Sequence, residues 1–256
     1  MPSDLVHADG CLPGMLYGRT VSVDDFDSER ERAGYYGQQR SDLVANLPRP
    51  VGRVLDLGCG EGGAAAGLRA AGATWISGVE LHASAAARAS EVQDETLIGR
   101  IEDVLDQLQG PFDTILLYDV LEHLPDPVSV LVALQDQAVP GTRLQVSVPN
   151  ARHWSLVRDL VARGTFGYQD SGHRDVTHLR WFTRADLESL LRETGWAPEP
   201  RSHPALHGRH ARLHRVTRGG LAEFTFWQWV VLARRDESSG SSQAYLRPAA
   251  PSFSAK

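Results

Sequence analysis

Two groups of residues in this 256-residue sequence could do chemistry. The first is VLDLGCGEGG, residues 54–63, where an apolar run with Asp56 leads into a turn rich in glycine. Glycine lets the backbone approach a ligand closely, and a turn between a strand and a helix is suited to binding nucleotides. The second is DVLEH, in which Asp119, Glu122 and His123 stand at i, i+3 and i+4. On a helical turn these side chains would point to one side, where two carboxylates and an imidazole can hold a divalent cation.

The glycine-rich turn is compatible with two kinds of nucleotide. Gly58, Gly60 and Gly63 fit the G-x-G-x-x-G spacing of a dinucleotide site. Asp56, just before the turn, would repel a phosphate but would attract a sulfonium or an ammonium group. Glu80, at the end of the next predicted strand, suits the ribose hydroxyls of either ligand. The additional carboxylate therefore favours a cationic adenosine compound.

Alternating strands and helices would position these residues. The apolar runs predict strands over 53–57, 74–80, 111–119 and 143–149, and a last strand over 223–234. The patterns between them predict helices over 62–72, 82–91, 152–164 and 183–196, and one that begins near Pro127 and ends at Pro140-Gly141. Such alternation predicts an α/β fold with a mostly parallel sheet and helices on both faces.

Composition narrows the classes of protein. Hydrophobic residues make up 42% of the chain and charged residues 23%, as in ordinary globular proteins. The net charge of −6 disfavours nucleic acid as a main partner. We find neither an apolar run of about 18 residues nor a signal-peptide pattern, so we expect no membrane span and a cytoplasmic location. The cysteines, Cys11 and Cys59, have no metal-binding spacing.

Over about residues 35–235 the chain resembles the class I S-adenosylmethionine-dependent methyltransferases. VLDLGCGEGG, GVELHASA and FDTILLYDVLEHLPDP are similar to their first, second and fourth motifs. The resemblance implies a Rossmann-like seven-stranded sheet with an antiparallel last strand, and S-adenosylmethionine as the methyl donor. The third motif departs from the family pattern, because Arg100 in IGRIEDV stands where an aspartate reaches the adenine. The implied donor-binding residues are Asp56, Gly58, Cys59, Gly60, Glu80, Leu81, Ile101, Glu102, Tyr118 and Asp119.

The resemblance also implies residues on the acceptor side. The spacing resembles that of metal-dependent O-methyltransferases of quinone biosynthesis and of small-RNA 2′-O-methyltransferases. In the latter, a histidine shortly before a W-T-R-like stretch completes the metal site, and His178 before LRWFTR matches that position. The implied ligands of Mg²⁺ or another divalent cation are Asp119, Glu122, His123 and His178. In metal-free relatives the acid contacts the donor's amino group and a histidine acts as the base. Both mechanisms stay open, with His123, His178 and Asp119 as the candidate catalytic residues.

We therefore expect an enzyme that O-methylates a small molecule or a sugar or glycan hydroxyl. An arginine-rich stripe over 207–218 would suit an anionic acceptor. The alternatives are RNA 2′-O-methylation, N-methylation of a small amine, and a non-catalytic regulator that binds S-adenosylmethionine. The predicted organisation is an N-terminal extension over 1–34, a methyltransferase domain over 35–235 with an acceptor lid around 150–182, and a disordered tail over 236–256.

Overall fold

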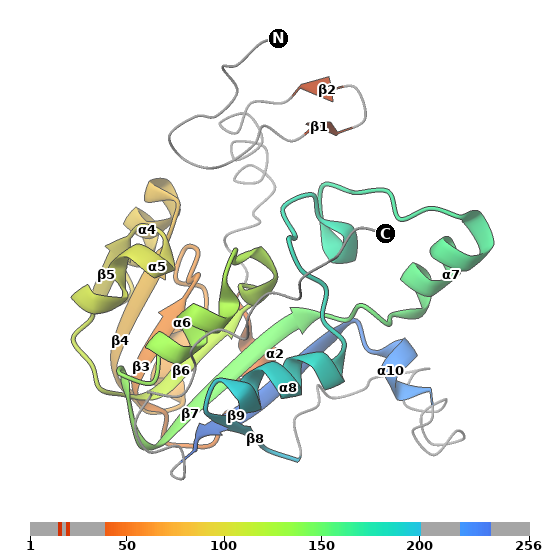
Figure 1. Ribbon diagram of the computed structural model, residues 1–256. Helices are drawn as coiled ribbons and strands as arrows, with labels where there is room; N and C mark the ends of the chain where they lie inside the picture. Colours follow the sequence, from red (N-terminus) through yellow and green to blue (C-terminus); the bar gives the residue numbers. More distant parts are fainter. Residues whose placement is uncertain (1–14, 17–18, 21–38, 201–220, 237–256) are drawn as a thin grey trace, which may run out of the picture.

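The computed structural model describes residues 15–16, 19–20, 39–200 and 221–236. Its centre is a twisted sheet of seven strands in the order β5-β4-β3-β6-β7-β9-β8 (Figure 1). These strands are β3 Gly52–Leu57, β4 Ala73–Glu80, β5 Glu95–Ile98, β6 Phe112–Tyr118, β7 Ala138–Pro149, β8 Trp196–Pro198 and β9 Gln228–Arg235. A separate two-stranded ladder joins β1 Met15–Leu16 and β2 Arg19–Thr20.

Strand direction follows the predicted fold class. β3 pairs in parallel with β4 and β6, and the parallel pairing continues to β5 on one side and β7 on the other. β9 runs antiparallel to both β7 and β8. The prediction of a mostly parallel, Rossmann-like sheet of seven strands with an antiparallel last strand is confirmed.

Helices cover both faces of this sheet (Figure 1). The helices are α2 Ser41–Val44, α3 Ala65–Ala70, α4 Ala83–Ala89, α5 Ile101–Val104, α6 Pro127–Ala133, α7 Trp154–Arg163, α8 Arg184–Glu193 and α10 Ala222–Thr225. Side chains of α2 and α3 pack with alternate residues of β3, β4 and β6 in one core, while α5, α6 and α8 pack in a second core. The strands between the two cores are buried on both faces, which explains their continuous apolar sequences.

Local sequence explains several helix boundaries. Thr183 and Asp186 form a reciprocal capping box at the start of α8. The Asp126 side chain accepts a hydrogen bond from Ser129 N at the start of α6, and Pro127 occupies its first turn. None of the helices among the described residues has the length and apolar character that a bilayer crossing requires.

Two predicted boundaries were wrong. The helix from Pro127 ends at Ala133, and Pro140-Gly141 lies inside β7, where the register with β6 shifts and Thr142 Oγ1 accepts a hydrogen bond from Val139 N at 2.9 Å. The run over 223–234 begins in the short helix α10 before β9 starts at Gln228. The predicted extension over 1–34 falls almost wholly outside the described residues, as does the tail over 236–256; the arginine-rich stripe over 207–218 lies entirely outside them.

Candidate functional site

The glycine-rich turn follows β3 at the edge of the sheet where the parallel strands end. Gly58 and Gly60 have φ of +70° and +55°, in the left-handed region that glycine adopts most readily. The amide nitrogens of Gly58 and Cys59 donate to Val79 O of β4 at 2.8 and 3.1 Å. A Cβ on Gly58 would lie 2.6 Å from Val120 Cγ2. The turn is therefore tied to β4 and packed tightly against the loop after β6.

Two buried acids stand beside this turn. Glu80 Oε2 accepts a hydrogen bond from Gly60 N at 2.8 Å, and its Oε1 accepts one from His82 N at 3.0 Å. Asp56 is 3% exposed. Burial raises the pKa of Asp56 to about 7, although the positive charge of Arg40 opposes this shift and the Glu80 carboxylate adds to it. A cationic ligand would stabilise the ionised form of Asp56, so these acids fit a sulfonium compound better than a pyrophosphate.

The other predicted donor-binding residues differ in their surroundings. Cys59 is buried and burial raises the pKa of its thiol, so this residue stays neutral. Leu81 is 57% exposed just beyond β4, where its side chain could lie against an adenine. Ile101 is buried at the start of α5. Glu102 Oε2 lies 4.0 Å from Arg100 Nε. Tyr118 packs in the core and its hydroxyl donates to Gln145, so only its backbone faces the edge of the sheet.

Asp119 lies apart from the helical face on which the sequence places it. Its φ of +56° turns the backbone away from the short 3₁₀ helix η3, Leu121–His123. Asp119 Oδ2 is 2.7 Å from Arg40 Nη1, and its Oδ1 accepts hydrogen bonds from Ser147 and Gln228. Arg40 could not be predicted as a site residue, because no sequence pattern marks the residues before α2.

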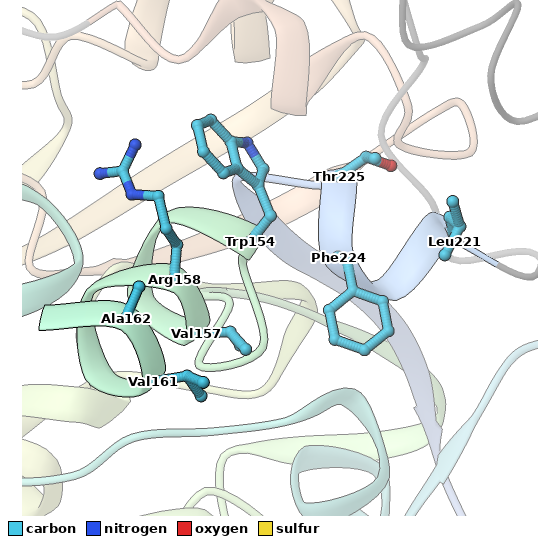
Figure 2. Close-up of a pocket in the computed structure, with 8 residues that line it drawn as sticks. All are labelled: Trp154, Val157, Arg158, Val161, Ala162, Leu221, Phe224 and Thr225. Atoms are coloured by element: carbon cyan, nitrogen blue, oxygen red, sulfur yellow. The ribbon is translucent and has the colours of Figure 1, made fainter. Parts of the chain in front are cut away.

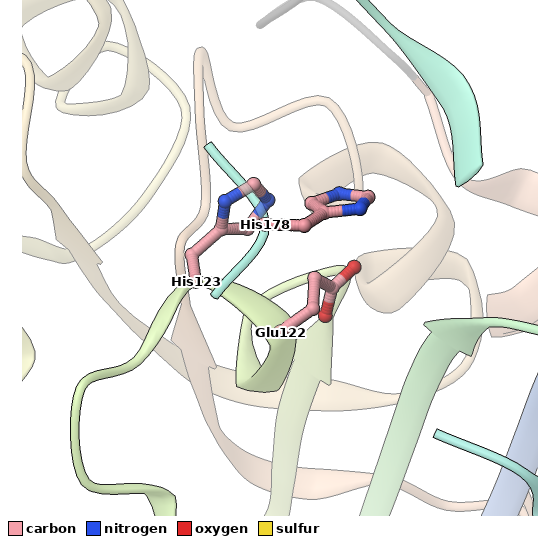
Figure 3. A group of neighbouring side chains, drawn as sticks. All are labelled: Glu122, His123 and His178. Atoms are coloured by element: carbon pink, nitrogen blue, oxygen red, sulfur yellow. The ribbon is translucent and has the colours of Figure 1, made fainter. Parts of the chain in front are cut away.

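Three of the four residues predicted to bind a metal come together. One ligand atom each of Glu122, His123 and His178 lies within 4.8 Å of the others, and Figure 3 shows the three side chains gathered at one place. The rings of His123 and His178 meet edge to face with their centroids 4.8 Å apart. Asp119 is outside this group because it is held by Arg40.

Glu122 has the environment of a metal ligand or of a neutral acid. It is 1% exposed, and neither carboxylate oxygen has a hydrogen-bond partner in the described part of the chain. Burial, with a further contribution from Asp119, raises the pKa of Glu122 well above its usual value. An unpaired buried carboxylate is costly unless it is protonated or binds a cation. Its position beside two imidazoles fits a divalent cation with nitrogen and oxygen ligands.

A chain of hydrogen bonds orients His123. Thr177 Oγ1 donates to Asp175 Oδ1 at 2.7 Å and lies 3.1 Å from His123 Nδ1. Because the Thr177 hydroxyl proton is directed to Asp175, this oxygen accepts from His123 Nδ1–H, as Thr177 O does at 3.2 Å. The neutral ring then carries its lone pair on Nε2, the nitrogen able to take a proton or bind a metal. The sequence analysis did not identify Thr177.

The segment predicted as an acceptor lid lies beside this group. Leu179 N and Arg180 N donate to Glu122 O at 2.8 and 3.2 Å, which ties the end of the segment to η3. Phe166 and Tyr168 lie near the Trp181 ring, with centroid separations of 5.5 and 6.2 Å. The role of this segment in acceptor binding stays a prediction.

Comparison with known proteins agrees with this geometry. The model of a family described as "Methyltransferase domain" matches residues 28–200. The ubiquinone biosynthesis O-methyltransferase of Xylella fastidiosa strain 9a5c is 36% identical over 172 residues, which are 61% of this chain and 65% of that protein. The protein of the same name from Xanthomonas campestris pv. campestris strain B100 is 27% identical over 62% of this chain and 71% of its own length. The chain thus spans less than two thirds of the Xylella relative.

Solved structures share the fold. An S-adenosylmethionine-dependent methyltransferase from Mesorhizobium loti has a TM-score of 0.53 at 20% identity, covering 78% of this chain and 99% of its own. Magnesium protoporphyrin IX methyltransferase from Synechocystis has a TM-score of 0.52 at 21% identity, covering 86% and 91%. The order of the strands, the acidic glycine turn and the family match lead to one conclusion: this chain belongs to the methyltransferase-domain family, with the class I S-adenosylmethionine-dependent fold.

Proposed function

We propose that this protein transfers the methyl group of S-adenosylmethionine to a hydroxyl of a small-molecule acceptor. The observation that carries the proposal is that Glu122 and His123 follow β6, the neighbour of β3, and that Val120 of the same loop packs against Gly58 of the acidic glycine turn. The first site suits a cationic adenosine compound, and the second can take a proton from a hydroxyl. The relatives named ubiquinone biosynthesis O-methyltransferase support O-methylation of a small-molecule acceptor.

In this proposal, the chain's acids and glycines hold the donor. The glycine turn brings the backbone close to the adenosine, and the Glu80 carboxylate is placed to accept from the ribose hydroxyls. Ionised Asp56 favours the positive charge of the donor. Arg40 and Asp119 form an ion pair, and each has the charge opposite to one end of a methionine group. Arg40 can pair with the carboxylate of the donor, and Asp119 with its ammonium. Donor binding would then exchange this internal pair for two pairs with the ligand.

The histidines serve the acceptor. Methyl transfer is an in-line displacement, so the protein must align the acceptor oxygen and remove its proton. His123 Nε2 is the basic nitrogen of its ring, and Asp175 and Thr177 fix that tautomer. Glu122, His123 and His178 would hold Mg²⁺ or another divalent cation. When bound, such an ion lowers the pKa of a coordinated hydroxyl.

The test of the function is methyl transfer from radiolabelled S-adenosylmethionine to a panel of catechols, other phenols, sugars and small amines, with and without Mg²⁺. We expect labelled ether products from phenolic or sugar hydroxyls, with S-adenosylhomocysteine formed in equal amount, and their loss in His178→Ala. In parallel, calorimetry measures the binding of S-adenosylhomocysteine and of a nicotinamide dinucleotide. Donor binding without turnover on any acceptor would indicate a regulator, and selective binding of the dinucleotide would overturn the assignment.

A further inference from the structure

An apolar groove lies between α7 and α10 (Figure 2). Its volume is 620 Å³, within the range of roughly 300–1,000 Å³ that is typical of sites for one small molecule. The groove, called here the α7–α10 groove, is lined by Trp154, Val157, Arg158, Val161, Ala162, Leu221, Phe224 and Thr225. Its size is that of a site for a single ligand.

The side chains of this groove are unusually exposed for their type. Val161 is 79% exposed, Trp154 46% and Leu221 42%. Trp154, Val157 and Val161 stand at i, i+3 and i+7 of α7, positions whose apolar side chains ordinarily face a core. Covering such side chains stabilises by about 25 cal/mol per Å² of apolar surface removed from water. An occupant with an apolar chain would therefore gain free energy by lying along this part of α7.

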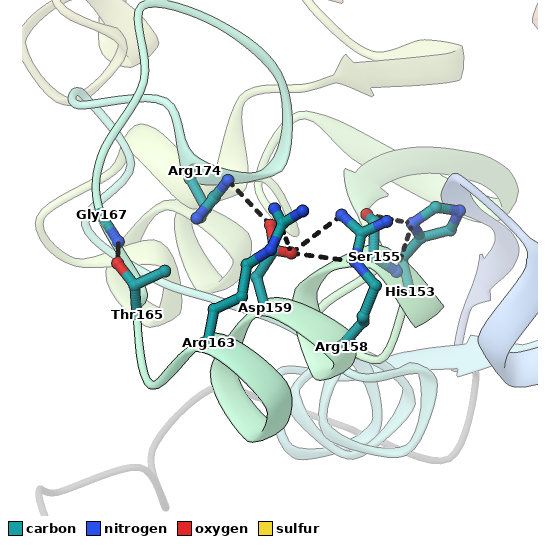
Figure 4. A network of polar contacts seen from close by, with 8 residues as sticks. All are labelled: His153, Ser155, Arg158, Asp159, Arg163, Thr165, Gly167 and Arg174. Atoms are coloured by element: carbon teal, nitrogen blue, oxygen red, sulfur yellow. Dashed lines mark hydrogen bonds and ion pairs between the residues drawn. The ribbon is translucent and has the colours of Figure 1, made fainter.

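A cluster of arginines borders the same helix. Asp159 Oδ1 accepts hydrogen bonds from Arg158 Nη2 at 2.8 Å and from Arg163 Nη1 at 3.1 Å, and its Oδ2 accepts from Arg174 Nη2 at 3.3 Å (Figure 4). One carboxylate thus faces three guanidinium groups. The Arg158 and Arg163 side chains are 44% and 64% exposed. This arginine cluster keeps a surplus of positive charge that a phosphate or carboxylate would complement.

Arg158 belongs to both features. It lines the α7–α10 groove, and its guanidinium carbon lies 4.9 Å from the centroid of the Trp154 ring. At the opposite wall, Arg152 lies over Phe224 but is paired with Glu223, so it adds no net charge. The positive charge is therefore concentrated on the α7 side, where the groove meets the arginine cluster.

The groove leads toward the histidine group through a series of rings. The His153 ring centroid lies 5.8 Å from that of Trp154 and 4.8 Å from that of His173, against which it stacks. His173 O lies 3.4 Å from His178 Nδ1. The Trp154 wall of the groove is thus connected to His178 through the packed, buried rings of His153 and His173.

We propose that the α7–α10 groove and the arginine cluster form the binding site for the tail of the methyl acceptor, an amphiphilic anion with a phosphate or carboxylate next to an apolar chain. The apolar chain lies between α7 and α10, and the anionic group binds Arg158 and Arg163. The volume of the groove and the arginines at its border suit a single anionic molecule. Naming this ligand an acceptor rests on the proposed methyl transfer, whereas its binding does not.

The experiment is calorimetric titration of the full chain with decyl phosphate and with decanoate, each below its micellar concentration, and with neutral decyl glucoside and inorganic phosphate. We expect decyl phosphate or decanoate to bind at least about tenfold more tightly than decyl glucoside or phosphate alone, and the better of the two identifies the anion. Arg158→Gln with Arg163→Gln should weaken this binding about tenfold, and Val161→Asp should weaken it as much. The matched control is Arg192→Gln, because Arg192 is similarly exposed and pairs with Glu188 at i,i+4 as Arg163 does with Asp159.

Four results would overturn the proposal. They are equal binding of charged and neutral amphiphiles, no effect of the arginine or Val161 variants, binding only to phosphatidylglycerol vesicles, and a dimer in sedimentation that Val161→Asp dissociates. Each is measured without a methyl donor. Loss of methyl transfer with retained decyl phosphate binding would count against the proposed function alone, and methyl transfer without such binding would count against this site alone.

Discussion

Arg40 Nη1 lies 2.7 Å from Asp119 Oδ2, and these two residues are also the non-glycine residues with positive φ in the described part of the chain. Their φ values are 46° and 56°. A left-handed backbone costs free energy for such residues, and strain of this kind concentrates at ligand sites. One partner precedes α2 and the other follows β6, so the ion pair joins the start of the domain to the edge of the sheet where the donor is proposed to bind.

Arg40→Gln should weaken donor binding. The substitution removes the cation proposed to pair with the donor's carboxylate, so the dissociation constant of S-adenosylhomocysteine should rise about tenfold or more, as expected for a lost charged hydrogen bond. Calorimetry measures this change. Arg49→Gln is the control, because Arg49 Nη1 contacts Ala70 O at 3.5 Å on the far side of α3. Unchanged affinity in Arg40→Gln would show that the ion pair only supports the fold.

Donor affinity should rise with pH. The pKa of Asp56 is about 7 in the free protein because the side chain is buried, and a cationic donor would lower it. The bound state then holds fewer protons, so affinity for S-adenosylmethionine increases as pH rises toward about 7 and levels off above it. The gain between about pH 6 and pH 8 should be about tenfold.

The matching measurement is calorimetry in buffers with different ionisation enthalpies, which detects the proton that Asp56 releases. In Asp56→Asn the dependence on pH should vanish, because no proton is left to release at this position. The same slope in wild type and variant would assign the titration to another group.

The parts that could be predicted from the sequence are those encoded by neighbouring residues. The glycine turn and the acids Asp56 and Glu80 sit within or directly beside buried strands, and strand ends locate them without knowledge of distant contacts. The pairing of β9 with β7 follows less directly from the residues and came from the resemblance. The predicted helix end at Pro140-Gly141 was wrong because this proline and glycine, which usually end a helix, lie here in a strand at a register shift.

The missed features depend on contacts between distant segments. Arg40 meets Asp119 across 79 positions of the sequence, and Thr177 meets His123 across 54. The spacing of Asp119, Glu122 and His123 predicts one face only if the turn is helical, and the left-handed backbone at Asp119 breaks that condition. Nor does the sequence reveal that Asp159 pairs with three arginines, since Arg174 comes from a separate element, the short 3₁₀ helix η4 Gly172–Arg174.

Glu122→Gln should abolish metal binding without unfolding the protein. Burial raises the pKa of Glu122 well above its usual value, which favours the neutral carboxyl group when no cation is bound, and a glutamine resembles that form in shape and charge. Mg²⁺ or Mn²⁺ should raise the melting temperature of the wild type as its concentration rises, and should leave that of Glu122→Gln unchanged. Glu188→Gln on α8 serves as the control and should respond like the wild type. A metal response that persists in Glu122→Gln would remove this residue from the metal site.

Gly58→Ala should destabilise the fold and disturb the donor turn. The new Cβ would lie 2.6 Å from Val120 Cγ2, and the residue has a φ of +70°. Gly141→Ala separates the two causes, because its φ of +89° carries the backbone cost while nothing lies within 4 Å of its Cβ. We expect Gly141→Ala to lower the free energy of unfolding by about 1 kcal/mol, and Gly58→Ala to lower it by about 1–3 kcal/mol more. Equal losses in denaturant titration would show that the turn relaxes away from Val120.

Thr177→Val should slow catalysis while leaving donor binding intact. Thr177 Oγ1 lies 3.1 Å from His123 Nδ1 and is itself directed by Asp175, so its loss frees the imidazole to change tautomer or rotate. Partners of this kind are typically worth about 10–100-fold, so we expect kcat to fall by that factor while the dissociation constant of S-adenosylhomocysteine stays the same. Thr165→Val, which removes a hydroxyl that accepts from Gly167 N in the same segment, should keep wild-type kcat. Equal kcat in the two variants would show that the Thr177 hydroxyl does not orient His123.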